Sequence, residues 1–229
     1  MNLSIIIPAY FEGKNILPTL KEISKLVKTE HEVIIICDNK SDPTVNVIKR
    51  LKKKNIYIIL NSIGSKKGPA NAVKTGFLRA KGDLVCVVMA DLSDDLIKID
   101  KAVKIINNGK DIVCFSRYMK GGRQIGGPFL KGMLSRLAGL SLFYLFNFPT
   151  HDPTNSFKLY KKLILNKITI ESEDGFDFNL ELIAKAYKKG YKIGEIPAIW
   201  RDRTAGKSRF KLLKWLPKYL KWYWHILWI

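Results

Sequence analysis

Cysteine and histidine are scarce in this chain of 229 residues, and their scarcity excludes several kinds of site. The three cysteines, Cys37, Cys86 and Cys114, are scattered, and no CxxC spacing or cluster of histidines indicates zinc. Their odd number also argues against a disulfide framework. We therefore expect buried thiols in a reducing compartment, and a cytoplasmic protein.

Long hydrophobic runs and two nucleotide-binding motifs are missing as well. No run of about 18 uncharged apolar residues is present, so we predict no membrane span. Because a strand begins by Leu3, we expect no signal peptide. The glycines do not form GxGxxG after the first strand, and there is no Walker A sequence, which disfavours a Rossmann dinucleotide site and a P-loop.

Acidic residues are in deficit, since 20 Asp and Glu stand against 40 Lys and Arg and give a formal net charge of +20. Such a charge indicates an anionic partner: nucleic acid, an anionic membrane surface or a phosphorylated substrate. No nucleic-acid recognition motif is present, so we do not expect nucleic acid. At 47% hydrophobic residues the chain can form one large core, and its oligomeric state stays open.

Apolar runs alternate with helix-like segments through the first half of the chain. This alternation predicts βαβ units, hence an α/β fold with a mostly parallel central sheet flanked by helices. Asn15 is expected to cap the first helix, and a later helix and strand are expected at 176–188 and 192–200. The other expected strands are 3–7, 32–37, 56–60, 84–89 and 111–115, and the other expected helices are 15–27, 44–53, 70–80 and 95–107.

Three carboxylates follow the buried run at 84–89: Asp91, Asp94 and Asp95. The carboxyl end of a central strand is where open α/β sheets place ligands, and a carboxylate there can hold Mg²⁺ or Mn²⁺ against a diphosphate. For Asp91 we favour such a site. Asp94 and Asp95 directly precede an expected helix, and for these two we favour helix capping.

Polar residues also follow the first two expected strands. Tyr10 and Glu12 come after the first strand, and Asp38 comes after the second. Because the carboxyl ends of parallel strands meet at one edge of a sheet, these side chains should converge with Asp91 on one crevice. The crevice suits a nucleotide whose diphosphate is held through a metal.

Nine short motifs follow one another in order: 8–12, Asp38 with 41–44, 90–93, 116–122, 152–160, 175–181, 195–197, 201–203 and 206–208. Together they resemble the inverting family-two glycosyltransferases of GT-A fold, most closely the dolichyl-phosphate mannose synthase branch. The resemblance covers roughly residues 3–210 and implies a GT-A domain at 1–209. It also implies a nucleotide-sugar donor (GDP-mannose or a UDP-sugar), a Mg²⁺ or Mn²⁺ ion, and a polyprenyl- or dolichyl-phosphate acceptor.

The resemblance also assigns roles by motif match. Asp91 and Arg117 are implied as catalytic residues, and Asp91 with Ser93 as metal ligands. The implied donor-binding residues are Pro8, Tyr10, Glu12, Asp38, Ala90, Asp91, Arg201, Arg203 and Lys207. The implied acceptor-phosphate residues are Arg117, Lys131, Ser135 and Arg136.

This chain departs from the family pattern at three positions. The family usually has Asp where this chain has Met89 and Cys37, and Asn where it has Phe11. Loss of the first metal-side Asp should weaken cation binding or transfer part of it to Ser93, Asp94 and water. A catalytically weak homologue that binds nucleotide-sugar is therefore one alternative.

Two apolar segments could contact lipid. At 123–149, basic residues precede an apolar, aromatic run, which fits equally a buried core helix or a helix at the acceptor mouth. The tail at 210–229 is basic and rich in tryptophan, and Pro217 should kink it. We favour a membrane-interfacial amphipathic helix for the tail, at the cytoplasmic face, over one docked on the protein's own core. The basic residues of the tail are Lys211, Lys214, Lys218 and Lys221, and its tryptophans are Trp215, Trp222, Trp224 and Trp228.

The acceptor decides which catalytic groups are required. A lipid monophosphate is already anionic at pH 7 and needs no side-chain base, which agrees with the lack of an expected crevice position for His31, His151 or His225. In-line attack on the anomeric carbon would then invert its configuration. A saccharide acceptor is the alternative and would require a carboxylate base. The candidates for that base are Asp152, Asp174 and Glu181.

Overall fold

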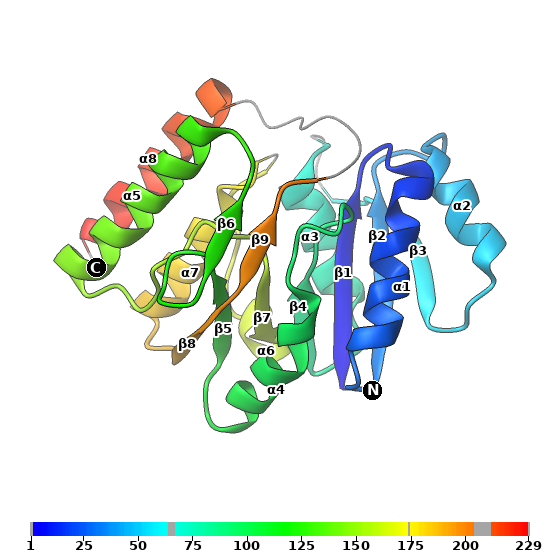
Figure 1. Cartoon of the computed structure of the whole chain (residues 1–229), viewed down its shortest axis with the longest axis horizontal. Coiled ribbons are helices and arrows are strands. Elements are labelled where there is room, and N and C mark those ends of the chain that lie inside the picture. Colours follow the sequence, from blue (N-terminus) through cyan, green and yellow to red (C-terminus); the bar gives the residue numbers. More distant parts are fainter. Residues whose placement is uncertain (1, 64–66, 174, 204–211, 229) are drawn as a thin grey trace.

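A seven-stranded sheet forms the centre of the computed structural model, which describes residues 2–63, 67–173, 175–203 and 212–228 (Figure 1). The strand order is β3-β2-β1-β4-β7-β5-β8. Neighbouring strands are parallel except where β7 pairs with β4 and β5, which confirms the mostly parallel sheet. The strands are β1 (Leu3–Ala9), β2 (His31–Cys37), β3 (Ile56–Leu60), β4 (Leu84–Val87), β5 (Ile112–Ser116), β7 (Lys158–Lys161) and β8 (Ile193–Pro197).

Helices cover both faces of this sheet because its central strands are apolar on both faces. In β1, Ile5 and Ile7 pack into one hydrophobic cluster, and Ile6 packs into the other. On the first face lie α1 (Ile16–Leu26), α2 (Pro43–Leu51) and α4 (Ile99–Asn107), and on the second lie α3 (Pro69–Arg79), α6 (Lys162–Leu165) and α7 (Phe178–Lys188).

The expected strand at 192–200 is divided in two. It ends in the main sheet at Pro197, and β9 (Ile199–Arg201) then pairs in parallel with β6 (Arg123–Ile125) as a separate ribbon. This ribbon crosses the carboxyl-end side of the sheet between the central strands and α5 (Figure 1). It therefore brings the segment that follows β9 toward the ends of β1 and β4.

Helix starts are only partly as expected. Asp42 caps α2, because its Oδ1 accepts a hydrogen bond from the Thr44 backbone N–H at 2.8 Å. Asn15 makes no side-chain cap bond, so that expectation is wrong. A 3₁₀ turn, η1 (Gly13–Asn15), leads into α1 instead, and a second, η2 (Leu96–Lys98), leads into α4.

The helices α5 (Phe129–Phe146) and α8 (Leu212–Leu227) lie side by side at one end of the molecule (Figure 1). All of α5 is described, and within it only Gly139 and Leu142 are buried, so the core-helix interpretation of this segment is wrong. Its exposed apolar residues are Phe129, Leu130, Met133, Leu137, Tyr144, Leu145 and Phe146.

The prediction that no segment spans a membrane stays a prediction. By length and composition α5 is long and apolar enough to cross one: it has 18 residues, a mean hydropathy of 1.3 and 11% of its residues buried. The sequence criterion missed it because Lys131 and Arg136 interrupt the run near one end. Length and composition alone do not decide whether such a helix spans.

The tail helix α8 has one buried side and one exposed side. Trp215, Trp222 and Ile226 are buried against the protein's own helices, which is the arrangement we did not favour. Trp224 and Trp228 are 58% and 83% exposed. Lys211 lies outside the described residues. Membrane contact by the tail therefore stays a prediction, now confined to its exposed side.

Candidate active site

A cavity of about 880 Å³ lies at the carboxyl ends of β1, β2 and β4 and continues between α5 and α8. One part is polar and charged, and the part between the two helices is mostly apolar. Most residues implied by the resemblance line it: Pro8, Tyr10, Glu12, Asp38, Asp91, Ser93, Arg117, Lys131, Ser135 and Arg203.

Three of the implied residues that the structure describes are not brought to the cavity wall. Ala90 is buried behind it, and its carbonyl accepts a hydrogen bond from Thr19 Oγ1 at 2.8 Å. Arg136 and Arg201 are exposed and do not line the cavity. Lys207 lies outside the described residues.

The loop after β1 is held in an uncommon backbone conformation. Phe11 has a φ of 55°, in the left-handed region that disfavours bulky residues. Two side chains at the start of α2 hold the loop: Asp42 Oδ2 accepts from the Phe11 N–H at 2.7 Å, and Thr44 Oγ1 accepts from the Gly13 N–H at 2.9 Å. The strained loop thereby presents Tyr10 and its neighbours to the cavity.

At the end of β2, Asp38 is oriented by an amide side chain. Asn61 Nδ2 donates to Asp38 Oδ1 at 2.8 Å, and the Asn61 side-chain oxygen accepts from Thr75 Oγ1 at 2.9 Å. Lys67 donates to the Asn61 carbonyl at 2.9 Å and also lines the cavity. This end therefore combines a fixed carboxylate with a lysine, which suits the polar groups of a nucleotide.

Asp91 is engaged by a cation from the segment after β9. Its Oδ2 lies 2.6 Å from the Nη2 of Arg203, whose Nη1 is 3.8 Å from Glu12 Oε1. Its Oδ1 accepts from the Ser93 N–H at 3.2 Å across Leu92, which is also left-handed with a φ of 59°. The two carboxylates thus share one guanidinium at the place where the sequence predicted a metal.

The capping roles expected for Asp94 and Asp95 are wrong. Asp94 is buried and its Oδ2 accepts from the Met89 N–H at 2.8 Å, which fixes the end of β4. Burial raises the pKa of Asp94 to about 7; the Met89 hydrogen bond opposes the rise and the nearby Asp91 charge adds to it. Asp95 Oδ2 instead accepts from the Ile199 N–H at 3.1 Å and ties β9 to this loop.

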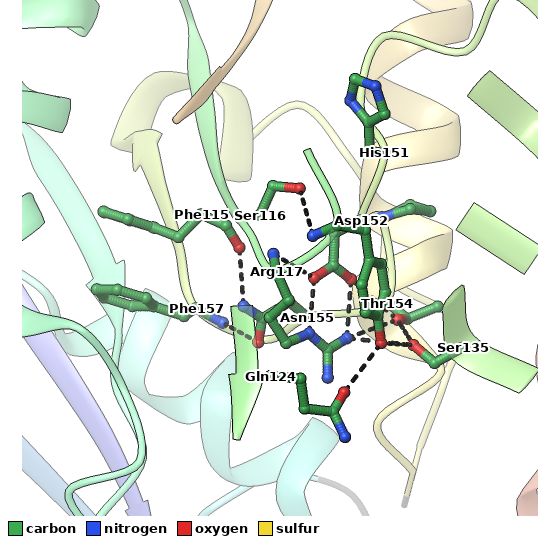
Figure 2. Close-up of polar contacts among 12 residues, drawn as sticks. Phe115, Ser116, Arg117, Gln124, Ser135, His151, Asp152, Thr154, Asn155 and Phe157 are labelled. Atoms are coloured by element: carbon green, nitrogen blue, oxygen red, sulfur yellow. Dashed lines mark hydrogen bonds and ion pairs between the residues drawn. The ribbon is translucent and has the colours of Figure 1, made fainter. Parts of the chain in front are cut away.

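Arg117 is locked in place by a buried carboxylate (Figure 2). Its Nε and Nη2 donate to Asp152 Oδ2 and Oδ1 at 2.7 and 2.8 Å, and its backbone N–H donates to Oδ2 at 3.0 Å. Nη2 also lies 3.1 Å from Ser135 Oγ and 3.2 Å from Thr154 Oγ1. Burial alone would raise the pKa of Asp152, but the Arg117 charge and hydrogen bonds hold it below its ordinary value. The guanidinium is therefore a fixed cation in the cavity wall.

A second buried cation shapes the loop that carries Asp152. Lys158 on β7 is fully buried, and its Nζ donates to the carbonyls of Pro153 and Asn155. Burial lowers its pKa to about 8. Sequence reasoning assigned no role to Lys158. The one signal in the sequence that could have indicated a role was a lysine flanked by apolar residues.

Lys131, one turn into α5, faces the same region as Arg117. Burial, together with the positive charges of Arg117 and Arg203, lowers the pKa of Lys131 to about 8, against the opposing effect of Asp202 and Asp91. The cavity wall is thus strongly cationic between the end of β5 and the start of α5. An anionic group is the natural occupant of this position.

Of the three carboxylates considered as a base, the two that the structure describes are already engaged. Asp152 is bound by Arg117, as above. Glu181 is buried, accepts from the Glu171 and Ser172 N–H groups at 2.6 and 2.8 Å, and forms an ion pair with Lys185 at 2.6 Å. Asp174 lies outside the described residues.

The fold is shared with solved glycosyltransferases. A crystal structure of glucosyl-3-phosphoglycerate synthase from Mycobacterium tuberculosis, in complex with Mn²⁺, UDP and glucosyl-3-phosphoglycerate, superposes with a TM-score of 0.73. That match covers 99% of this chain and 78% of the other at 16% identity, so it defines the fold alone. The expected GT-A fold is confirmed.

The family follows from the sequence comparison. The model of glycosyl transferase family 2 matches residues 4–169, and the chain belongs to this family. It is 28% identical, over 97% of its length, to a dolichol-phosphate mannosyltransferase of Pyrococcus furiosus, and it spans 64% of that protein. It is 24% identical, over 92% of its length, to a polyprenol monophosphomannose synthase of Mycolicibacterium smegmatis, of which it covers 85%.

Proposed function

We propose that this protein transfers a sugar from a nucleotide-diphosphate sugar to a polyprenyl monophosphate, with inversion at the anomeric carbon. The observation that carries the proposal is the composition of the cavity. Carboxylates at the strand ends form one part, a locked arginine forms the middle, and an apolar groove between α5 and α8 forms the other part. The names of the Pyrococcus and Mycolicibacterium relatives support the same acceptor class.

The acceptor phosphate would lie against Arg117 and Lys131. Asp152 holds the guanidinium of Arg117 in one orientation, so little side-chain freedom is lost when an anion binds. The phosphate oxygen is already charged and attacks the anomeric carbon without loss of a proton. The reaction thus depends on alignment and charge stabilisation.

A saccharide acceptor is less well supported. It would require a carboxylate that can take a proton from a hydroxyl group. Asp152 is bound to Arg117, and Glu181 is bound to two backbone N–H groups and Lys185. Among the described residues, none of the histidines lines the cavity.

The donor would occupy the strand-end part of the cavity, with GDP-mannose or a UDP-sugar as the donor class. The chemistry of the donor set fits a Mg²⁺ or Mn²⁺ ion only in part: Asp91, with Ser93 beside it, supplies one carboxylate, and substrate phosphates and water would complete the shell. Such an ion would neutralise charge on the diphosphate leaving group. Before the donor binds, Arg203 neutralises Asp91 and Glu12. After it binds, the same guanidinium would pair with the diphosphate.

The exposed apolar side of α5 and α8 would rest on a membrane surface, where a polyprenyl phosphate resides. Phe129, Leu145 and Trp224 are 83%, 71% and 58% exposed, and the chain carries a net charge of +20. A basic protein with an exposed aromatic surface suits the interface of an anionic bilayer. The cytoplasmic face remains the expected side.

The test is transfer of radiolabel from a panel of GDP- and UDP-sugars to polyprenyl phosphate with Mn²⁺ or Mg²⁺. Label should enter the organic phase with one donor and should be lost with Asp91→Asn. The matched control is Asp111→Asn, which alters an ion pair with Lys161 outside the cavity and should keep activity. Absence of lipid-phase label, with nucleotide binding intact by calorimetry, would favour a saccharide acceptor or a binding-only homologue.

A further inference from the structure

The apolar part of the cavity ends at a pair of hydroxyl groups. On α5 the described lining residues run from Lys131 to Ser141, and on α8 they run from Trp215 to Tyr223. Ser141 Oγ and the Tyr223 hydroxyl are 2.9 Å apart, so the last lining residue of one helix is joined to the last of the other. A polar bridge between the two helices therefore lies at the far end of the groove.

The proton positions in this bridge are determined by a third group. Ser141 Oγ donates within its own helix to the Ala138 carbonyl at 3.1 Å, so the Tyr223 hydroxyl donates to Ser141. Both side chains are half-buried among apolar neighbours. A hydrocarbon chain that separated them would leave the Tyr223 hydroxyl without its acceptor, which is unfavourable.

The length of the groove can be compared with the repeat of a prenyl chain. Ten residues separate Lys131 from Ser141, which is about 15 Å along a helix. The four chain carbons of an isoprene unit span about 4–5 Å when extended, by ordinary bond lengths and angles. The groove therefore has room for about three isoprene units between the phosphate position and the bridge.

We propose that the protein recognises only the first three or so isoprene units of its acceptor and that the Ser141–Tyr223 bridge ends this recognition. The inference rests on the proposed function, because it takes the acceptor phosphate to lie at Arg117 and Lys131. Beyond the bridge the chain leaves the groove beside exposed apolar residues of both helices, such as Leu145 and Trp224. A prenyl chain is the fitting occupant because the cavity is cationic at one end of the groove and apolar along it.

The experiment measures transfer to prenyl monophosphates of one to six isoprene units, below their micelle concentrations, with the preferred donor and Mn²⁺. We expect kcat/KM to rise at least tenfold per unit through the third and then to change less than threefold. A value that keeps rising with every unit, or is flat from the first, would overturn the inference while leaving the proposed function in place. Absence of transfer to every acceptor, with donor binding intact, would overturn the proposed function and the inference with it.

Variants test the bridge itself. Tyr223→Phe and Ser141→Ala each remove the hydrogen bond from one helix and should move the plateau to a longer acceptor. Tyr144→Phe is the matched control, because Tyr144 is 69% exposed on α5 and does not line the cavity. An unmoved plateau in both bridge variants would show that the bridge does not end recognition. The wild-type length series tests the length limit even if one variant fails to fold.

Discussion

At the scale of single residues, the site depends on the Arg117–Asp152 pair. Two bonds from the guanidinium and one from the backbone N–H all end on one buried carboxylate. A buried ion pair of this kind adds little net stability but becomes costly when one partner is removed. Its value here is orientation, because Arg117 can present one face to an anion without reorganising.

Asp152→Asn should therefore raise the acceptor KM by about 30-fold or more, since losing bonds to a charged group costs about 2 kcal/mol. The Kd of the donor nucleotide, measured by calorimetry, should change little. Thr154→Val is a milder variant that removes a 3.2 Å hydrogen bond to Arg117 and should move the acceptor KM in the same direction. Equal losses of donor and acceptor binding would indicate a general structural defect instead.

The lowered pKa of Lys131 predicts a pH dependence. Because its pKa is about 8 rather than 10.5, Lys131 is protonated below pH 8 and loses its charge as the pH rises through that value. The acceptor kcat/KM should therefore fall above about pH 8. In Lys131→Arg the fall should move to higher pH. An unchanged profile would assign the titration to another group, with Lys158 the foremost candidate.

These residue contacts show the limit of reading the sequence. The strand-end residues were predictable, because any parallel sheet brings Tyr10, Asp38 and Asp91 to one edge. The partner of Arg117 was not, since Asp152 lies 35 residues away in a loop and was considered as a base. Arg203 and Asp91 are 112 residues apart, and their contact likewise could not be predicted from the spacing of motifs.

At the scale of elements, the placement of α5 depends on Gly139. A Cβ at this position would overlap the carbonyl oxygen of His151, so only glycine lets α5 approach the loop that carries Asp152. His151 also stacks on Phe143 of α5, with ring centroids 3.6 Å apart, and its Nδ1 is 2.7 Å from Glu195 Oε2. The helix that carries Lys131 and Ser135 is thus fastened directly to the loop behind Arg117.

Gly139→Ala should destabilise the protein by about 1–3 kcal/mol through this overlap, although alanine is normally the better helix former. Calorimetry should show a Tm lower by roughly 3–10 °C, together with a higher acceptor KM. The control is Gly132→Ala on the same helix, where the added methyl would meet only the end of the Gln124 side chain, which can move. Equal Tm values for wild type and Gly139→Ala would contradict the close approach.

Strands that are buried on both faces were predicted well because a short, continuous apolar run between turn residues is typical of a strand in a parallel sheet. The strand β7 was missed because its sequence begins and ends with lysine. Lys158 satisfies its buried amine with two carbonyls, and Lys161 reaches Asp111 at 2.9 Å. Neither of these lysine interactions can be predicted from the sequence before the fold is known. The exposure of α5 was likewise undecidable, because apolar composition does not distinguish a core from a membrane-facing surface.

At the scale of the whole molecule, a net charge of +20 accompanies the exposed apolar surface of α5 and α8. We expect binding to anionic phosphatidylglycerol vesicles that weakens with added salt and with loss of apolar contacts on α5. Leu145→Ser should weaken sedimentation with vesicles by about tenfold. Leu78→Ser is the matched control, because Leu78 lies on α3 and both leucines are 71% exposed. Equal vesicle binding by the two variants would show that α5 is not part of the membrane-facing surface.

The most direct test of the proposed function compares two acceptors with the same apolar chain, farnesyl phosphate and farnesol, in one reaction with the preferred labelled donor. We predict transfer to the phosphate alone, giving a single anomer of inverted configuration, because the acceptor phosphate is proposed to lie at Arg117 and Lys131. The two described base candidates, Asp152 and Glu181, are already held by Arg117 and Lys185. Transfer to farnesol at a comparable rate, or a product of retained configuration, would contradict this prediction.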